Sequence, residues 1–168
     1  VEIFGLFAHW TDEIFYISDR QNQPQQAKFY PLKVGESAKY ESIEKALSEF
    51  QIGAALVPSW YPSGVDSFTV TASVTDLGMG IHMASDGNSP SLILTISDFN
   101  KETGPTTIIE KDDSEVISHE VGDIVHYIIN DGKWCSATWI VDDLQCIIEG
   151  DITTEEMIRI LDSIYEVS

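Results

Sequence analysis

Strict alternation of apolar and polar residues runs through the middle of the chain and predicts β-strands. In the run SFTVTASVT, Phe68, Val70, Ala72 and Val74 alternate with threonine and serine. A two-residue period places successive side chains on opposite faces of a strand, so one face of this strand is expected to be buried.

Seven further runs have strand-like composition and follow one another at short intervals. They are residues 78–85, 91–99, 106–110, 115–121, 123–130, 133–141 and 144–150. Because turn residues separate these runs, each is expected to pair with its neighbour in the sequence. The pattern predicts a curved antiparallel meander of about eight strands, in which 106–110 and 115–121 form a hairpin.

Three segments instead repeat apolar residues every three or four positions, which is the spacing of an amphipathic helix. The apolar positions are Ile3, Leu6, Phe7, Trp10, Ile14 and Ile17 in residues 1–18, Tyr40, Ile43, Leu47 and Phe50 in residues 39–50, and Met157, Ile160, Leu161 and Ile164 near the C-terminus. The run QNQPQQ predicts a flexible connector between the first two segments.

The expected fold class is therefore α+β, with two N-terminal helices and one C-terminal helix packed on the sheet. We divide the chain into an N-terminal helical segment, 1–53, and a sheet with the last helix, 54–168. We expect both parts to form one compact unit.

Dipeptides that favour tight turns predict the register of the last four strands. The predicted turns are Gly122-Asp123, Asp131-Gly132 and Asp142-Asp143. They place opposite each other the pairs His119 and His126, Ile128 and Cys135, His126 and Ala137, Trp139 and Cys146, and Ala137 and Ile148. The core face then collects Ile124, Ile128, Ala137, Trp139, Val141, Leu144, Cys146 and Ile148, while Ser136, Thr138, Gln145 and Glu149 lie on the other face.

The same register bears on the two cysteines. Cys135 and Cys146 share the core face, but four residues along the strand separate Cys135 from the partner of Cys146, a distance of about 13 Å. A disulfide does not span that distance. Two buried thiols are therefore the favoured interpretation, and a Cys135–Cys146 bridge is the alternative.

The charge balance restricts the kinds of partner. The 168 residues include 9 basic and 28 acidic residues, a formal net charge of −19. Nucleic acids and anionic membranes both require a basic face, so neither is an expected partner. The sequence also lacks the motifs of zinc proteases, P-loop proteins and dinucleotide-binding proteins. We assign no catalytic residue and no cofactor from the sequence.

Two sets of polar residues are candidates for metal binding. His119 and His126, paired across two strands, could share a zinc ion, but no third and fourth ligand is evident. Hydrogen bonds from both imidazoles to neighbouring residues are the favoured alternative. The loops 111–114 and 142–143 carry paired aspartates that could bind calcium, although solvated turns explain them better.

Aromatic and acidic clusters complete the candidate chemistry. Trp10, Trp60, Trp134 and Tyr127 could form a platform for a sugar or peptide, or pack beneath a helix. The acidic run EGDITTEE resembles a metal site, but Thr153 and Glu156 have the spacing of a capping box. We therefore interpret this run as the start of the last helix.

The order of these features resembles an uncharacterised bacterial family, a domain of unknown function. The resemblance rests on FAHWTDEIF, YESIEKALSEFQI, VPSWYPSGV, the antiparallel strands and the closing WIVDDLQCIIEGDITTEEMIRILDSIY. This family forms the C-terminal, extracytoplasmic part of single-span membrane proteins of Gram-positive bacteria, some of them similar to anti-sigma factors. The resemblance implies a transmembrane helix and a cytoplasmic segment upstream of Val1, so that residues 1–53 would be membrane-proximal.

The resemblance carries no catalytic residues to this sequence. It implies a non-enzymatic sensor or regulatory domain at the cell surface, which responds to an unidentified protein or small-molecule signal. The alternative is a carrier domain that binds a small ligand or peptide on the concave face of the sheet. An enzyme is the least favoured class.

Overall fold

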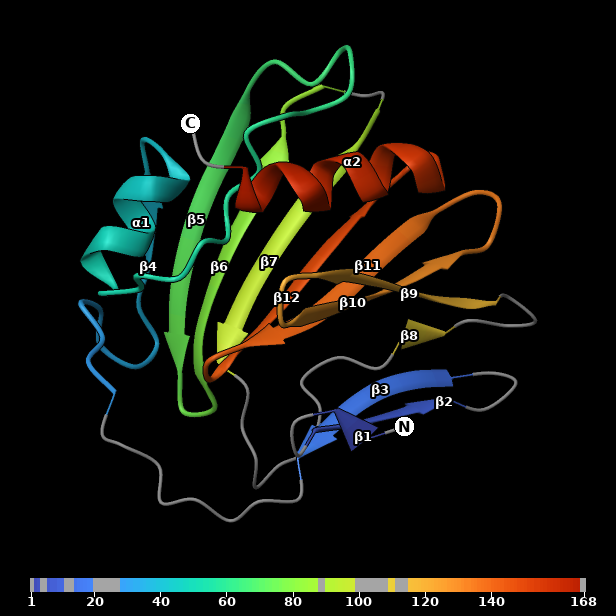
Figure 1. Ribbon diagram of the computed structural model, residues 1–168. Coiled ribbons are helices and arrows are strands. Elements are labelled where there is room, and N and C mark those ends of the chain that lie inside the picture. The colour runs from blue at the N-terminus through green and yellow to red at the C-terminus, as the bar shows by residue number, and fades with distance from the viewer. Residues whose placement is uncertain are drawn as a thin grey trace.

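The computed structural model describes residues 28–87, 90–98 and 115–166, together with the backbone of four short strands elsewhere in the chain. An open eight-stranded antiparallel sheet is its main element (Figure 1). The strands are β4 (Ser37–Tyr40), β5 (Phe68–Thr75), β6 (Gly78–Ser85), β7 (Leu92–Asp98), β9 (Val116–Val121), β10 (Ile124–Asn130), β11 (Cys135–Val141) and β12 (Leu144–Gly150). The sheet twists strongly, so that β9 and β10 run at a wide angle to β5 and β6 (Figure 1).

The strand order corrects the predicted meander. The order is β4-β5-β6-β7-β12-β11-β10-β9, so two four-stranded meanders meet where β7 pairs with β12. Both strands at this junction have apolar residues on both faces, as in Leu92-Ile93-Leu94 and Cys146-Ile147-Ile148. Central strands are buried on both faces, so this composition suits β7 and β12 in the middle of the sheet. A meander in sequence order would instead place β12 at an edge.

The predicted hairpin between 106–110 and 115–121 is wrong. Strand β8 (Ile109–Glu110) pairs with β3 (Ile14–Asp19), through Ile14 opposite Glu110 and Phe15 opposite Ile109. The prediction rested on the turn-like sequence between the two runs, which is a local signal. The observed pairing joins β8 to β3, and these strands lie far apart in the chain. The loop 111–114 itself lies outside the described residues.

The predicted helix over residues 1–18 is also wrong. This segment forms β1 (Glu2–Ile3), β2 (Leu6–Trp10) and β3, which with β8 make a four-stranded sheet. Short apolar runs fit a helix or a strand by periodicity alone. The deciding property is composition, because the segment is rich in aromatic and β-branched residues, which prefer strands.

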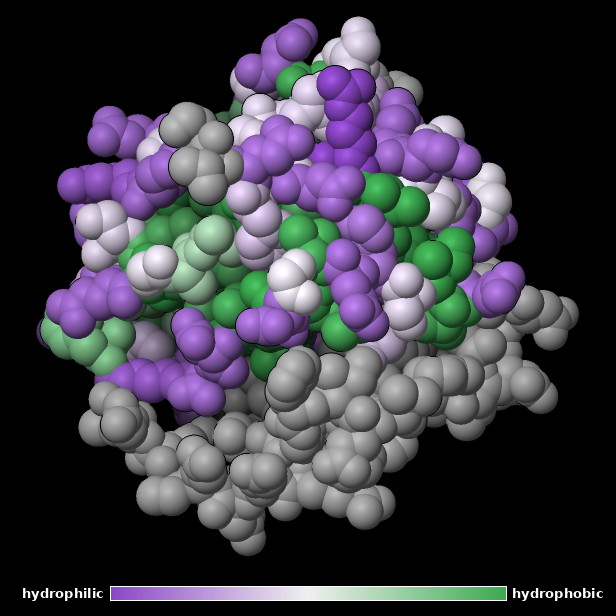
Figure 2. All heavy atoms as spheres, viewed as in Figure 1, coloured by the Kyte–Doolittle hydropathy of each residue, from purple (hydrophilic) through white to green (hydrophobic). Residues whose placement is uncertain are grey.

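Two helices are described in place of three, and both lie on one face of the eight-stranded sheet (Figure 1). Helix α1 (Ile43–Glu49) is shorter than predicted, because Tyr40 belongs to β4 and Ser42 caps the helix by accepting a hydrogen bond from Lys45 N. Helix α2 (Thr154–Tyr165) packs on the sheet, as predicted, and runs across the strands (Figure 1). Among the described residues, hydrophilic side chains predominate toward the upper part of this face, and hydrophobic residues show between them near its middle (Figure 2).

The predicted core face is confirmed. Ile128, Ala137, Trp139, Leu144, Cys146 and Ile148 are buried in one cluster with the apolar residues of both helices, and Ile124 and Val141 pack against it. The predicted registers at 122–123 and 142–143 are correct, since His119 lies opposite His126, Trp139 opposite Cys146 and Ala137 opposite Ile148. Both cysteines are free and buried.

The register at Asp131-Gly132 differs from the prediction by two residues. Asn130 lies opposite Cys135, and Ile128 opposite Ala137. The turn is longer than two residues because Asp131 Oδ1 accepts hydrogen bonds from Lys133 N at 2.8 Å and Trp134 N at 2.6 Å. A slip of two residues leaves every side chain on its predicted face, which is why the predicted core face survives the error.

Candidate functional site

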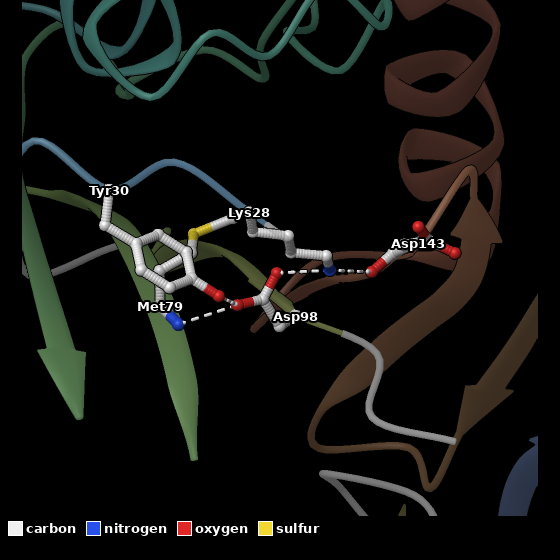
Figure 3. A network of polar contacts seen from close by, with 5 residues as sticks. All are labelled: Lys28, Tyr30, Met79, Asp98 and Asp143. Atoms are coloured by element: carbon white, nitrogen blue, oxygen red, sulfur yellow. Dashed lines mark hydrogen bonds and ion pairs between the residues drawn. The ribbon is translucent and has the colours of Figure 1, made fainter. Parts of the chain in front are cut away.

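A single buried carboxylate stands out among the residues that the structure describes. Asp98, at the end of β7, is 6% exposed and is the one buried acidic residue of the described chain. Its Oδ1 atom lies 2.7 Å from Lys28 Nζ, and its Oδ2 atom accepts hydrogen bonds from Tyr30 Oη and, at 2.9 Å, from Met79 N (Figure 3). Asp98 therefore joins the segment 28–30 to two strands of the sheet.

Strand pairing places these groups around Asp98. Asp98 lies opposite Leu144, the first residue of β12, so the turn Asp142-Asp143 is next to its carboxylate. Lys28 Nζ donates a second hydrogen bond, of 3.3 Å, to the main-chain oxygen of Asp143 (Figure 3). The ammonium group of Lys28 thus lies between two oxygen acceptors, one from β7 and one from the β11–β12 turn.

A pocket of about 260 Å³ surrounds this polar group. Tyr30 and Phe50 supply aromatic walls, and Met79 and Leu144 supply aliphatic ones. Phe29 also lines the pocket, with 59% of its surface exposed. A concave, mainly apolar site with a few polar groups is the usual form of a small-ligand site, and this volume lies just below the usual range of about 300–1,000 Å³.

The electrostatics of the pocket favour a protonated Tyr30. Burial raises the pKa of Tyr30 well above its ordinary value, and the hydrogen bond to Asp98 and the negative charge of Asp98 raise the pKa further. Tyr30 therefore remains a hydrogen-bond donor to the carboxylate. The side chain of Lys28 is 27% exposed, so its ion pair with Asp98 is accessible to solvent.

The pocket also contains the two described non-glycine residues with positive φ, Gln51 at 57° and Asp142 at 52°. Gln51 follows α1, where Ile52 N donates to Leu47 O and Gln51 N donates to Ser48 O. These are the two bonds of a Schellman motif, whose left-handed position glycine normally occupies. Asp142 belongs to the two-residue turn, where aspartate accepts positive φ.

The histidine pair is brought together as predicted, with ring centroids 6.2 Å apart, but each imidazole is hydrogen-bonded to a neighbour. His119 Nε2 lies 2.7 Å from Asp162 Oδ1. His126 is fully buried, with Nδ1 3.2 Å from His119 O and Nε2 2.9 Å from Tyr165 Oη. Burial lowers the pKa of His126 to about 4. The neutral ring therefore donates from Nδ1 and accepts at Nε2.

No third ligand joins the histidines, since the described residues contain no group of three or more His, Cys, Asp or Glu side chains suited to a metal.

The loop 111–114 and the side chain of Trp10 lie outside the described residues. Asp142 and Asp143 form the β11–β12 turn beside the pocket.

The predicted aromatic platform does not form among its described members. Trp60 packs against the core on the helix-covered face, with the guanidinium of Arg159 4.0 Å from its ring centroid. Tyr127 is buried on the opposite face of the sheet. Trp134 is half-buried in the β10–β11 turn.

The acidic run 149–156 is the start of α2, as predicted. Thr153 Oγ1 accepts a hydrogen bond from Glu156 N at 3.1 Å, and a Glu156 carboxylate oxygen accepts one from Thr153 N at 2.9 Å. Ile152 and Met157 are both buried in the core. Asp151 has a further role, because its Oδ1 atom accepts a hydrogen bond from Ser91 N before β7.

The Asp98 pocket was not predicted from the sequence. Its parts come from residues 28–30, the end of α1 and the ends of β6, β7 and β12, and 70 positions separate Lys28 from Asp98. The one local signal is an aspartate at the end of a strand face that is otherwise apolar, formed by Leu92, Leu94 and Ile96.

A family model described as a domain of unknown function (DUF4367) matches residues 55–164. No curated protein and no solved structure matches the chain. The matched region contains Asp98, Met79 and the β11–β12 turn, whereas Lys28 and Tyr30 precede it. No helix in the described part of the chain is long and apolar enough to cross a membrane.

Proposed function

Because the chain belongs to the DUF4367 family, we propose that it is a non-enzymatic sensor or regulatory domain that binds a small ligand in the pocket beside Asp98. The observation that carries this proposal is the position of Asp98, a buried carboxylate that holds the segment 28–30 against the sheet at the pocket wall. A ligand that bonds to Asp98 competes with that segment for the same oxygens.

The competition gives the domain two states. In one, Lys28 and Tyr30 bond to Asp98; in the other, the ligand replaces at least one of them. A ligand shifts such an equilibrium only by its difference in affinity for the two states. Binding at Asp98 fulfils this condition, because the ligand and Lys28 require the same acceptor. The signal is then the release of residues 28–30, which lie before the matched family region.

We place the domain outside the cytoplasm, at the surface of a Gram-positive cell, anchored by an upstream transmembrane helix and in an anti-sigma-factor-like protein. The support is the resemblance of residues 58–62 and of the segment from Trp139 onward to domains in that setting. The net charge of −19 agrees with a domain held away from anionic surfaces.

The burial and hydrogen bonding of Cys135, Cys146 and His126 support a non-enzymatic role. Burial raises the pKa of Cys135 to about 11 and raises that of Cys146 further, so neither thiol ionises near neutral pH. Both nitrogens of His126 are hydrogen-bonded within the fold. Turnover of a cell-wall or peptide substrate by the purified chain would count against the proposal.

Amide exchange and NMR together test the sensor role. A panel of small cationic, anionic and neutral compounds is titrated while the Met79 amide signal is followed, because this amide donates to Asp98. A compound that shifts the signal and accelerates hydrogen exchange at residues 28–30 supports the proposal. Failure of every compound to shift it opposes the proposal.

A carrier domain is the second candidate, and the same pocket supports it. The core cluster fills most of the helix-covered face of the sheet, so we place the carrier site in the pocket at the edge of that face, where Phe50, Met79 and Leu144 line it. A carrier binds its ligand without releasing residues 28–30. Binding with unchanged exchange in that segment would therefore favour the carrier.

A further inference from the structure

Lys28 Nζ occupies a position shaped for an ammonium group. It lies 2.7 Å from Asp98 Oδ1 and 3.3 Å from the main-chain oxygen of Asp143, inside the pocket (Figure 3). We propose that this position is the subsite for the primary ammonium group of a small amine ligand, and that Lys28 is its tethered competitor. This inference rests on the proposed sensor function and names its ligand class.

Charge selects the class of ligand. Among the described residues that line the pocket, Lys28 is the one base, whereas Asp98, Asp142 and Asp143 are acids. Once Lys28 leaves, the charged side chains among these described lining residues are all acidic. A cation then gains an ion pair at Asp98, which stays bonded to Met79 N, while an anion meets a buried like charge.

The shape of the Lys28 Nζ position and the apolar walls around it narrow the class of ligand further. An ammonium group is a compact donor that bonds to acceptors in several directions, as Lys28 does here. The apolar walls from Phe50, Met79 and Leu144 accept a short alkyl or aryl group attached to the nitrogen. The volume of about 260 Å³ suits an amine smaller than a typical drug molecule.

The mechanism is exchange of one cation for another. A free amine donates to Asp98 Oδ1 and to the Asp143 carbonyl, and the Lys28 side chain moves into water. The side chain of Lys28 is already 27% exposed, so its release needs no opening of the core. Tethering gives Lys28 a high effective concentration at the subsite, so wild-type protein binds a free amine weakly.

The test is to remove the tethered competitor. In Lys28→Met an aliphatic side chain of similar length replaces the amine, and 2-phenylethylamine is titrated while the Met79 amide signal is followed. We expect Lys28→Met to bind this probe about tenfold tighter than wild type, or more, because the competing state is gone. Lys28→Arg is the matched control, since it keeps a tethered cation and is expected to bind the probe as weakly as wild type.

Two further arms establish that charge is recognised. 2-Phenylethanol and 3-phenylpropanoate have similar aromatic bodies without the positive charge, and neither is expected to shift the Met79 signal of Lys28→Met. The double variant Lys28→Met, Asp98→Asn is expected to lose binding of the amine. Near-ultraviolet circular dichroism establishes that each variant retains its tertiary structure.

Several results would overturn the inference. Equal affinity of wild type and Lys28→Met for the amine, or equal binding of amine and alcohol, would each do so. If Lys28→Met loses its tertiary structure, the wild-type protein is titrated instead. A shift of the Met79 amide signal by the amine but not by the alcohol then supports the inference. A shift by the alcohol but not by the amine overturns it. An anionic or neutral compound that releases residues 28–30 would overturn the amine class while leaving the sensor function standing.

Discussion

Gly78 lies directly against Asp98: a Cβ atom built on Gly78 would be 2.6 Å from Oδ2 of Asp98. The backbone of Gly78 also has a φ of 129°, which side-chain-bearing residues rarely adopt. Two independent reasons therefore require glycine at the start of β6. The close approach allows the next residue, Met79, to donate its N–H to the buried carboxylate.

Gly78→Ala is expected to destabilise the protein by about 2–3 kcal/mol, because backbone strain and displacement of Asp98 act together. Urea unfolding measures the change. The control is Gly122→Ala, where φ is 61° but no atom lies within 4 Å of the added Cβ. This control carries the strain alone, so its loss is expected to be smaller. Equal losses would show that the contact with Asp98 has no energetic consequence.

Stability is expected to depend on the protonation of His126. Its pKa falls from the ordinary 6.5 to about 4, chiefly through burial; its hydrogen bond to His119 O and the charge of Asp162 oppose the shift, and the charge of His119 adds to it. Between these two pH values the unfolded chain binds more protons than the folded one. Stability is therefore lost as pH falls from 6.5 to about 4, by about 3 kcal/mol from this group.

His126→Phe removes this contribution and is expected to flatten the pH dependence of the unfolding free energy in that window. The ring sits 5.0 Å from Trp139 and 5.6 Å from Tyr165, so an aromatic replacement keeps the packing. Tyr165→Phe is the matched control, because it removes the hydrogen bond to Nε2 while the imidazole stays buried. It is expected to retain the dependence. An unchanged profile in His126→Phe would contradict the assignment.

Ser163 joins the loop after α1 to the last helix. Its Oγ atom accepts hydrogen bonds from Ser59 N and Trp60 N, both at 3.2 Å, and donates to Ile160 O at 2.7 Å. Ser163→Ala leaves two N–H groups without their acceptor and is expected to cost about 2 kcal/mol. Ser59→Ala, which removes one hydroxyl bond at an exposed residue, is expected to cost less. Thermal unfolding of both variants tests this order.

The capping box gives a prediction confined to one helix end. Thr153→Ala removes the acceptor of Glu156 N and is expected to cost about 1 kcal/mol. Thr153→Ser keeps the hydroxyl and is expected to stay close to wild type. Denaturant unfolding distinguishes the two, and an equal loss in both would contradict the capping role.

Features encoded by neighbouring residues were predictable, and features that join distant segments were not. The 142–143 turn and the Thr153 cap each depend on a few adjacent residues, and both were predicted correctly. At Asp131 the dipeptide signal was overridden by the aspartate's own hydrogen bonds to Lys133 N and Trp134 N. Asp98 illustrates the limit of a local signal: its donors Lys28 and Tyr30 lie 70 and 68 positions away, and the β7–β12 pairing decides which turn lies beside it.

Gln51 offers a final test, one that separates stability from ligand binding. It holds a φ of 57° after α1, a conformation that costs a side-chain-bearing residue about 1 kcal/mol relative to glycine. Gln51→Gly is therefore expected to stabilise the protein by about 1 kcal/mol in urea unfolding. Gln51→Ala, which shortens the side chain but keeps the strain, is the control and is expected to show no such gain. Because Gln51 lines the pocket, 2-phenylethylamine is titrated into both variants on the Lys28→Met background. Weaker amine binding in both, with a gain in stability only in Gln51→Gly, would show that the glutamine side chain serves the ligand at the expense of the fold.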